Sequence, residues 1–399
     1  MSTQSVSIER MKAQPVAAEA RSSIGSRLLF VDNIRVFLTI LVILHHLMIT
    51  YAGAGSWDYM EGRQDVVVDA LGGWFCATNQ AYFMGLFLLI SAYFVPGSYD
   101  RKGAGRFLKD RLIRLGIPLA LYSWVINPLF WYAFSSQEIG MPFWRFFPGE
   151  YFRSGELLGH GPLWFIEVLL IFSLVYVVWR LVTRSRPSQP AVEARFPANG
   201  PIALFALLLG MAGFLVRVVF PMDGYTFRPL NLQLGFFAQY IALFVVGLTA
   251  YRRNWLLGLP DETGRLWLGI VVLLILLWAP MMVVNGAIND DNSFKGGWNW
   301  QSLLYALWES FLCISMCIGL IYAFRRYLNQ RGKVGGFLVP NAYTAYIIHA
   351  PVIITLAFAV RDVTLYPLLK WGLVALVAVP LCFGLSHLIR KLPYTDRVL

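Results

Sequence analysis

The chain has 399 residues, of which 58% are hydrophobic and only 14% are charged, and its mean hydropathy is +0.59. Because a soluble globular domain carries about 25% charged residues, this composition indicates a membrane protein. A net charge of +11 would also fit a nucleic-acid-binding protein. However, the basic residues fall in short pieces between apolar segments, with no zinc-finger spacing, so no nucleic-acid partner is expected.

The sequence predicts a tail at each end of the chain. Residues 1–27 are polar and include several basic residues, which predicts a disordered cytosolic tail. The apolar run that follows begins too late and is too long for a cleaved signal peptide, and no small-residue cleavage site follows it. We therefore expect it to remain as a transmembrane helix. Residues 391–399 are predicted to form a second, short cytosolic tail.

Ten apolar stretches are long enough to cross the hydrocarbon core as helices, which takes about 20 residues each. In chain order they cover 30–51, 74–95, 115–135, 162–182, 201–220, 232–250, 266–286, 302–323, 337–359 and 366–388. A break or kink is expected at Pro128 in the third stretch and at Pro340 and Pro351 in the ninth. The sequence therefore predicts an all-α fold, a polytopic membrane helix bundle of about ten transmembrane helices that fills 28–390.

The distribution of lysine and arginine predicts the orientation. With the N-terminus inside, the cytosolic segments hold 24 of the 33 basic residues and the external loops hold six. The remaining three, Arg35, Arg217 and Lys370, lie within or at the ends of the predicted helices. The bias follows the positive-inside rule, so both termini are expected in the cytosol.

The first predicted helix carries two ionisable residues that packing alone explains poorly. Arg35 and His46 are eleven residues apart, which places both side chains on one helix face, roughly 16 Å apart along the axis. Such groups are costly in hydrocarbon and usually mark a functional interior. A neutral imidazole there would serve as a general base for a hydroxyl nucleophile. A structural role for His46, as a histidine hydrogen-bonded between helices, explains the spacing equally well. His45 lies about 100° round the helix from the face of Arg35 and is the second candidate for the base.

Two basic groups are candidates for binding an anionic ligand at the cytosolic boundary. Asp32 and Arg35 either anchor the helix end as an ion pair, or Arg35 binds the ligand while Asp32 holds it in place. Lys109, Arg111 and Arg114 belong to a basic segment before the third helix, and guanidinium groups three residues apart suit phosphate. If that segment is considered alone, the positive-inside rule is the better explanation of its basic residues.

Three further ionisable residues fall inside apolar helices: Glu167, Glu309 and His349. Each should face the bundle interior, where it either borders a substrate cavity or bonds a neighbouring helix. Cys313 and Cys317 share a helix face, but two thiols without nearby ligands are more simply explained by packing. No metal site is therefore expected.

Several blocks follow one another in a recognisable order. The first helix carries Arg35 and, after ten intervening residues, His46. The later blocks lie at 89–118, 161–165, 308–310 and 346–349. Together they resemble the acyltransferase-3 family of bacterial integral membrane O-acyltransferases over about 28–390, and the last three blocks are similar to the branch that contains glucan biosynthesis protein C.

This resemblance implies roles for the candidate residues. His46 would be the catalytic base and Arg35 its essential partner, while Arg111 and Arg114 would lie where the acyl donor approaches. The donor is typically a cytosolic acyl-coenzyme A, and no cofactor is bound tightly. The acceptor is an extracytoplasmic carbohydrate hydroxyl, such as that of a periplasmic glucan, which receives an acetyl or succinyl group. The implied location is the lipid of the bacterial cytoplasmic (inner) membrane.

A transporter or exporter is the alternative, because an intramembrane Arg/His/Glu path would also account for the buried ionisable residues. An enzyme would cleave a thioester in a reaction that depends on His46, whereas a transporter would move its substrate without covalent change. The halves of the chain lack the matched, Gly/Pro-broken segments of inverted-repeat transporters, which favours the enzyme.

Overall fold

The long apolar runs form helices in the computed structural model, which describes residues 28–52, 55, 57, 59–61, 65–151, 161–183, 196–222, 230–286, 289, 291–393 and 395–399. The predicted tail over 1–27 lies outside these residues. The α-helices longer than two turns are α2 (Leu29–Ala52), α3 (Val66–Gln80), α4 (Phe83–Tyr93), α5 (Val95–Arg111), α7 (Asn127–Ile139), α9 (Trp164–Thr183), α10 (Asn199–Val219), α11 (Phe237–Arg252), α13 (Asp261–Val284), α14 (Trp300–Tyr327), α15 (Lys333–Ala359) and α16 (Pro367–Ile389).

The shorter α-helical pieces are α6 (Ile117–Leu121), α8 (Phe143–Arg145), α12 (Trp255–Gly258) and α17 (Thr395–Val398). The π-helical turns are η1 (Leu112–Gly116), η2 (Tyr122–Ile126) and η3 (Phe146–Tyr151), and the 3₁₀ turns are η4 (Gly161–Leu163), η5 (Leu234–Phe236) and η7 (Ser293–Lys295). Ten helical segments of the described chain are long and apolar enough to span a membrane. One of them joins α3 to α4, and another joins α5 to α7 through η1, α6 and η2. The predicted all-α, polytopic bundle of about ten transmembrane helices is confirmed.

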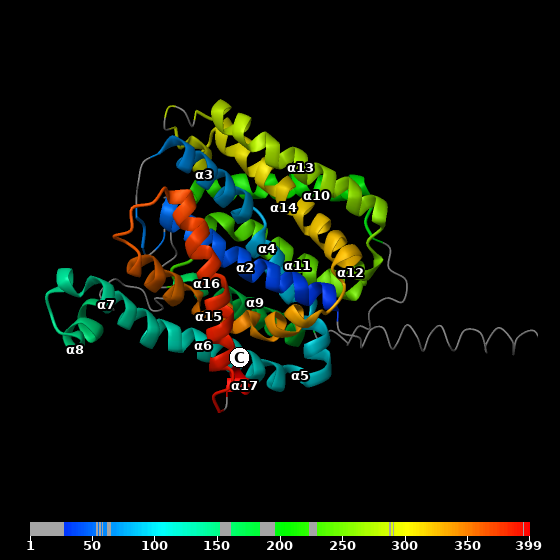
Figure 1. The fold of residues 1–399 in the computed structure, drawn as a ribbon. Coiled ribbons are helices and arrows are strands. Elements are labelled where there is room, and N and C mark those ends of the chain that lie inside the picture. Colours follow the sequence, from blue (N-terminus) through cyan, green and yellow to red (C-terminus); the bar gives the residue numbers. More distant parts are fainter. Residues whose placement is uncertain are drawn as a thin grey trace, which may run out of the picture.

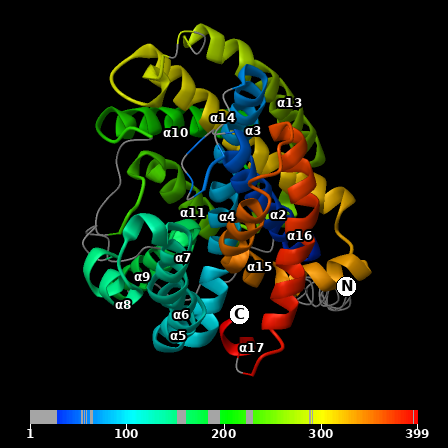
Figure 2. The same ribbon diagram turned by 60° about the vertical axis from the view of Figure 1, so that its left-hand side comes forward.

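Helix α2 lies at the centre of the bundle, with α3, α14, α15 and α16 packed against it (Figure 1). In its most apolar stretch 72% of the residues are buried, against 11% for α13 at the edge. Figure 2 shows the same arrangement from another side, with α5, α6 and α7 along the outside of the bundle. Residues placed on α2 are therefore surrounded by protein, whereas much of α13 is left to face lipid.

The second crossing starts earlier than predicted and is broken in the middle. It begins at Val66 instead of residue 74 because the Asp65 side chain caps the helix, accepting from the backbone N–H groups of Val67 and Val68 at 2.9 and 3.0 Å. The break falls at Tyr82, whose φ of −135° is not helical, and it separates α3 from α4. The ninth crossing, by contrast, remains one helix that contains both Pro340 and Pro351.

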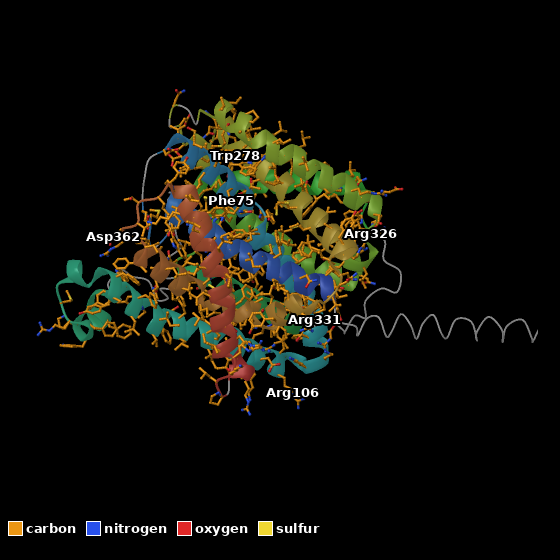
Figure 3. The ribbon with its side chains drawn as sticks, in the orientation of Figure 1. Phe75, Arg106, Trp278, Arg326, Arg331 and Asp362 are labelled. Carbon is orange, nitrogen blue, oxygen red and sulfur yellow. The ribbon has the colours of Figure 1, made fainter. Side chains whose placement is uncertain are left out.

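The start of α2 and the end of α16 lie on the same face of the bundle. Asn33 on α2 donates to the carbonyl oxygen of Leu328 at 2.6 Å, in the loop between α14 and α15. Arg390, just after α16, donates to the carbonyl oxygen of Pro340 near the start of α15. We call this the basic face, because Arg106, Arg326 and Arg331 lie toward it, whereas Asp362 lies on the opposite side (Figure 3).

Candidate active site

A large cavity opens inside the bundle beside the C-terminal half of α2. Its volume is about 1420 Å³, and α2 contributes both His45 and His46 to its wall. The lining extends to Gly55, Asn231 and Lys295, which lie beside helix ends opposite the basic face, and we call this end of the cavity its rim. Much of the wall is aromatic: Trp57, Phe83, Trp164, Phe236, Phe237, Tyr240, Trp278, Phe294, Tyr305 and Tyr346. His46 and the rim thus belong to one cavity with a largely aromatic wall.

His46 is hydrogen-bonded to His349 of α15. Its Nδ1 lies 3.0 Å from His349 Nε2, and the two rings stack with centroids 5.0 Å apart. The other nitrogen of His349, Nδ1, lies 2.5 Å from the carbonyl oxygen of Tyr346. Because that oxygen can only accept, we assign the proton to His349 Nδ1, so that His349 Nε2 accepts from His46 Nδ1. This arrangement leaves His46 Nε2 unprotonated, as a base requires.

Trp57 covers His46 from the loop that follows α2. Their rings stack with centroids 4.0 Å apart and planes 19° from parallel. Sequence reasoning missed Trp57, because it lies outside any helix and no periodicity singles it out. His45 also lines the cavity and packs on Phe83 at 4.9 Å, but its Nδ1 has no hydrogen-bond partner in the part of the chain that the structure describes. Of the two histidines, His46 is the one that is oriented by a partner.

Arg35 lies toward the other end of α2, away from the cavity. Its guanidinium carbon is 4.9 Å from the ring centroid of Phe94, and Nη1 is 3.8 Å from the carboxylate of Asp32. The cavity includes Val42 but no earlier residue of α2. The Asp32–Arg35 pair thus stands near the basic face, and the immediate partner of His46 is His349 rather than Arg35.

Arg111 and Arg114 gather near Arg35, where α5 passes into η1. The guanidinium of Arg111 lies over the ring of Phe107 at 5.0 Å, and it is within electrostatic range of both Arg35 and Arg114. Arg114 and Lys109 are exposed. The structure therefore brings together three of the predicted basic residues, and Lys109 lies on the same segment.

The π-helical turn η1 ties this basic segment to α15. Pro118 has no backbone N–H, so the carbonyl of Arg114, four residues earlier, loses its helical partner. The hydroxyl of Tyr343 donates to that carbonyl, with the oxygens 2.5 Å apart. Since Tyr343 and His349 belong to the same helix, α15 connects the arginine cluster with the histidine pair.

The cavity wall does not include Glu167, Glu309 or His349. Each lies about one helical turn further along its own helix than a residue that does line the cavity. Aromatic residues three or four positions earlier on the same helices take the places in the wall: Trp164, Tyr305 and Tyr346. Glu309 accepts from Arg217 at 2.5 Å, and both side chains are buried between α14 and α10. Glu167 is buried in the first turn of α9. From the sequence alone, each of these residues could either border a substrate cavity or bond a neighbouring helix. For Glu309 the structure shows the bond to a neighbouring helix.

Comparison with known proteins decides the family. The family model described as an acyltransferase domain, that of acyltransferase-3, matches residues 28–387. The chain belongs to the acyltransferase-3 family. Relatives called Glucans biosynthesis protein C, from Salmonella agona (strain SL483) and Salmonella paratyphi A (strain ATCC 9150 / SARB42), are 29% identical over 239 residues. That match covers 56% of this chain and 58% of each relative. No solved structure gives a significant match.

Membership in the acyltransferase-3 family makes the chain a multi-pass membrane enzyme of the O-acyltransferase type. Such an enzyme needs a base for the accepting hydroxyl and space beside that base for the acceptor. The imidazole of His46, which lines the cavity and has one nitrogen unprotonated in the assigned tautomer, has the chemistry for the first task. The cavity of about 1420 Å³ provides the space.

Proposed function

We propose that this acyltransferase moves an acetyl or succinyl group from a cytosolic acyl-coenzyme A to a hydroxyl of an extracytoplasmic carbohydrate at the bacterial inner membrane. The main support is His46, which lines a cavity whose rim lies opposite the basic face and which is hydrogen-bonded to His349 behind the wall. The basic face would then be cytosolic, in keeping with the positive-inside rule. The name of the Salmonella relatives favours a glucan as the acceptor.

The arginine cluster supports an anionic donor. Coenzyme A carries phosphates, and Arg111 and Arg114 offer guanidinium groups suited to bidentate phosphate binding. Arg35 would join them, held by Asp32 at 3.8 Å. It precedes His46 by eleven residues, or roughly 16 Å along α2. The extended pantetheine arm of coenzyme A spans a distance of this order, so the thioester would reach His46 while the phosphates stay at the arginines.

In the proposed mechanism His46 acts as a general base in a direct transfer. Its Nε2 takes the proton of the acceptor hydroxyl while the hydroxyl oxygen attacks the thioester carbonyl carbon. The tetrahedral intermediate then expels the sulfur of coenzyme A, which takes the proton from His46 and leaves as a thiol. In between, the charged imidazole of His46 is stabilised because its Nδ1–H donates to His349.

The cavity wall supports a carbohydrate acceptor. A sugar ring presents C–H faces that pack on aromatic rings, and hydroxyl groups that need polar partners. Trp57 and Trp164 offer such aromatic surfaces, while Asp69, Gln80 and Gln233 supply carboxylate and amide groups. A hydroxyl of a bound sugar would thus lie within the same cavity as the imidazole of His46.

The transporter alternative has less support. Two of the buried cations pair locally, Arg217 with Glu309 at 2.5 Å and Arg180 with Asp100 at 2.8 Å. Each pair joins two neighbouring helices, which accounts for these buried charges without a transport path. Membership in an enzyme family favours the same conclusion.

The experiment that tests the proposal measures thioester cleavage by the purified protein. Acetyl- or succinyl-coenzyme A is mixed with a glucose oligomer, the released thiol is followed with a thiol reagent, and the acylated sugar is identified by mass spectrometry. The variant His46→Ala should lower the rate by about 10²–10⁴-fold, the usual contribution of general-base catalysis. His45→Ala is the matched control, because it removes the neighbouring imidazole of the same cavity and should have a milder effect.

Two results would count against the proposal. Activity of His46→Ala within a few-fold of the parent rate would remove His46 from the mechanism, and a larger loss in His45→Ala would transfer its role to His45. Release of thiol without any acylated sugar would exclude a carbohydrate acceptor.

A further inference from the structure

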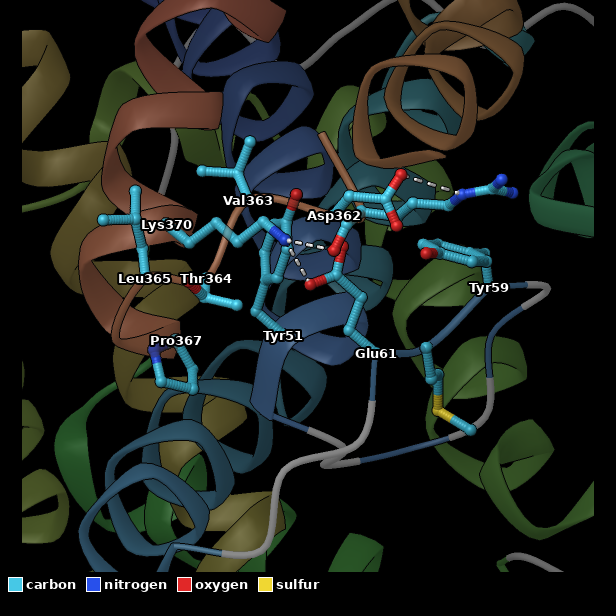
Figure 4. Close-up of a pocket in the computed structure, with 11 residues that line it drawn as sticks. Tyr51, Tyr59, Glu61, Asp362, Val363, Thr364, Leu365, Pro367 and Lys370 are labelled. Carbon is cyan, nitrogen blue, oxygen red and sulfur yellow. Dashed lines mark hydrogen bonds and ion pairs between the residues drawn. The ribbon is translucent and has the colours of Figure 1, made fainter. Parts of the chain in front are cut away.

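Figure 4 shows a second pocket at the C-terminal end of α2. The rim of the large cavity lies on this side of the bundle too, since Gly55 follows the same end of α2. We call the second pocket the outer pocket; its volume is about 390 Å³. It is formed where the end of α2, the loop after it and the segment between α15 and α16 meet, and the residues used below are Tyr51, Tyr59, Glu61, Arg361, Asp362 and Lys370. None of them has a role in the mechanism proposed above.

The outer pocket contains a buried polar cluster with unused hydrogen-bonding capacity. Lys370 of α16 is 3% exposed, and its Nζ donates to Glu61 Oε2 at 2.5 Å. The second oxygen of that carboxylate, Oε1, is buried and has no hydrogen-bond partner within the described part of the chain. The same holds for the hydroxyl of Tyr51, which is 2% exposed. Because burying such groups unpaired is unfavourable, a ligand with hydroxyl groups would complete this cluster.

The charges in the outer pocket favour a neutral ligand. Its two carboxylates are matched by two cations, since Glu61 pairs with Lys370 and Asp362 lies 3.6 Å from Arg361. Neither an anion nor a metal ion would find an uncompensated charge there. Tyr59 adds an aromatic ring, and burial together with the Glu61 carboxylate raises the pKa of Tyr59, so its hydroxyl stays protonated. Paired charges, hydroxyl groups and an aromatic ring suit a saccharide unit.

One short loop connects the outer pocket with the active-site cavity. Trp57 lines the cavity and stacks on His46, and Tyr59 and Glu61 follow it in the outer pocket. On α2, Tyr51 lies five residues after His46, which is about 7.5 Å along the axis and roughly 140° round it. One sugar unit cannot fill both places, whereas a chain of units can.

We propose that the outer pocket is a second carbohydrate subsite, which holds a sugar unit of an oligomeric acceptor other than the one that is acylated. This inference rests on the proposed function, because it assumes that the acceptor in the cavity is a saccharide. The subsite would make the enzyme prefer a long acceptor to a single sugar. Tyr51 and Glu61 would bind hydroxyl groups of the distant unit and take no part in the chemistry.

The test compares a long glucose oligomer with glucose as acceptors for two variants. Tyr51→Phe removes one hydroxyl with little change of shape, and Glu61→Gln replaces the free acceptor oxygen by an amide group and the ion pair with Lys370 by a neutral contact. The KM for the oligomer should rise about 3- to 10-fold, as expected for the loss of one hydrogen bond. The KM for glucose and both kcat values should change by less than about twofold. Tyr366→Phe is the matched control, because Tyr366 lies nearby but does not line the outer pocket.

Equal KM increases for both acceptors, or no increase for either, would overturn the proposal, and the second result would mean that water satisfies these groups. Calorimetric binding of the oligomer and thermal unfolding of each variant separate a lost subsite from a damaged fold. If the parent protein acylates no saccharide but binds the oligomer more tightly than Tyr51→Phe does, the proposed function fails and the subsite stands. If acylation occurs without preference for chain length, the function stands and the subsite fails.

Discussion

At the scale of single residues, His46, the proposed base, depends on its hydrogen-bond partner. His349 accepts a hydrogen bond from His46 at 3.0 Å, and the Tyr346 carbonyl accepts from His349 in turn. Removal of His349 would take away the acceptor that keeps the proton on His46 Nδ1, so that the other tautomer becomes accessible. We therefore expect His349→Ala to lower kcat by roughly 10- to 100-fold, by analogy with the loss of a hydrogen-bond partner that orients a metal-ligating histidine.

His349 is a positioning residue, so its loss should affect kcat and leave the KM of both substrates nearly unchanged. In His349→Gln, the side-chain carbonyl oxygen can accept from His46 Nδ1, and this variant should recover part of the rate. His387→Ala is the control, since His387 packs on Phe337 near the basic face. Steady-state kinetics of the three variants decides the matter, and a kcat within twofold of the parent value in His349→Ala would refute the assigned role.

The sequence singled out His46 as a candidate, and the structure places it on the cavity wall, but the sequence could not predict the residues around it. A helical period of 3.6 residues relates side chains within one helix, and it correctly placed Arg35 and His46 along α2. The hydrogen bond to His349 joins residues 303 positions apart, so it exists only after α2 and α15 have packed. Trp57 lies in a loop, where no period applies. Local pattern thus identified the ionisable residues, and tertiary packing chose their partners.

At the scale of the elements, the helical segment from α5 to α6 presents Arg111 and Arg114 near Arg35. Reversal of both charges, in Arg111→Glu with Arg114→Glu, should weaken the binding of an anionic donor. Hydrogen bonds to charged groups contribute about 1.5–3 kcal/mol each, so the KM for acyl-coenzyme A should rise at least about tenfold. The KM for the sugar acceptor should stay within about twofold. Steady-state titration of each substrate measures both values.

Arg326→Glu is the matched control, because Arg326 is an exposed arginine of the basic face at the end of α14. Cysteine accessibility of residues 97–114 shows whether a variant is correctly inserted. If the double variant is correctly inserted and its affinity for the donor is unchanged, the two arginines serve topology alone.

Helix number was predictable from the sequence, whereas some helix boundaries were not. Length and hydropathy suffice to count crossings, because each needs about 20 apolar residues. The first turn of α3 is apolar except for Asp69, and its true start at Val66 is set by the side chain of Asp65, which caps the helix. Pro128 was expected to disturb the third crossing, and the π-helical turn η2 ends just before Asn127-Pro128. Boundaries of this kind depend on caps and carbonyl partners that hydropathy does not record.

At the scale of the whole molecule, the position of α2 places the histidine pair between two different environments. The first turns of α2, which carry Arg35, lie on the basic face, and the C-terminal end of α2 reaches the rim of the cavity and the outer pocket. An enzyme with its donor and acceptor in different compartments requires such an arrangement, because neither substrate then has to cross the membrane. The proposed reaction therefore depends on which face of the bundle is cytosolic.

Topology reporters test this orientation directly. Fusions after residues 55, 150, 225, 295 and 362 should report the outside, and fusions after 103, 190, 258, 331 and 397 should report the cytosol. The physical reason is the excess of lysine and arginine in the second group of segments, which the insertion machinery retains inside. The expected pattern places Arg111 and Arg114 where cytosolic coenzyme A meets them, and the cavity rim where an external glucan does. If the segment 101–114 proved external, the arginines would face a compartment without acyl-coenzyme A. The donor assignment would then fail even though the His46–His349 pair remained intact.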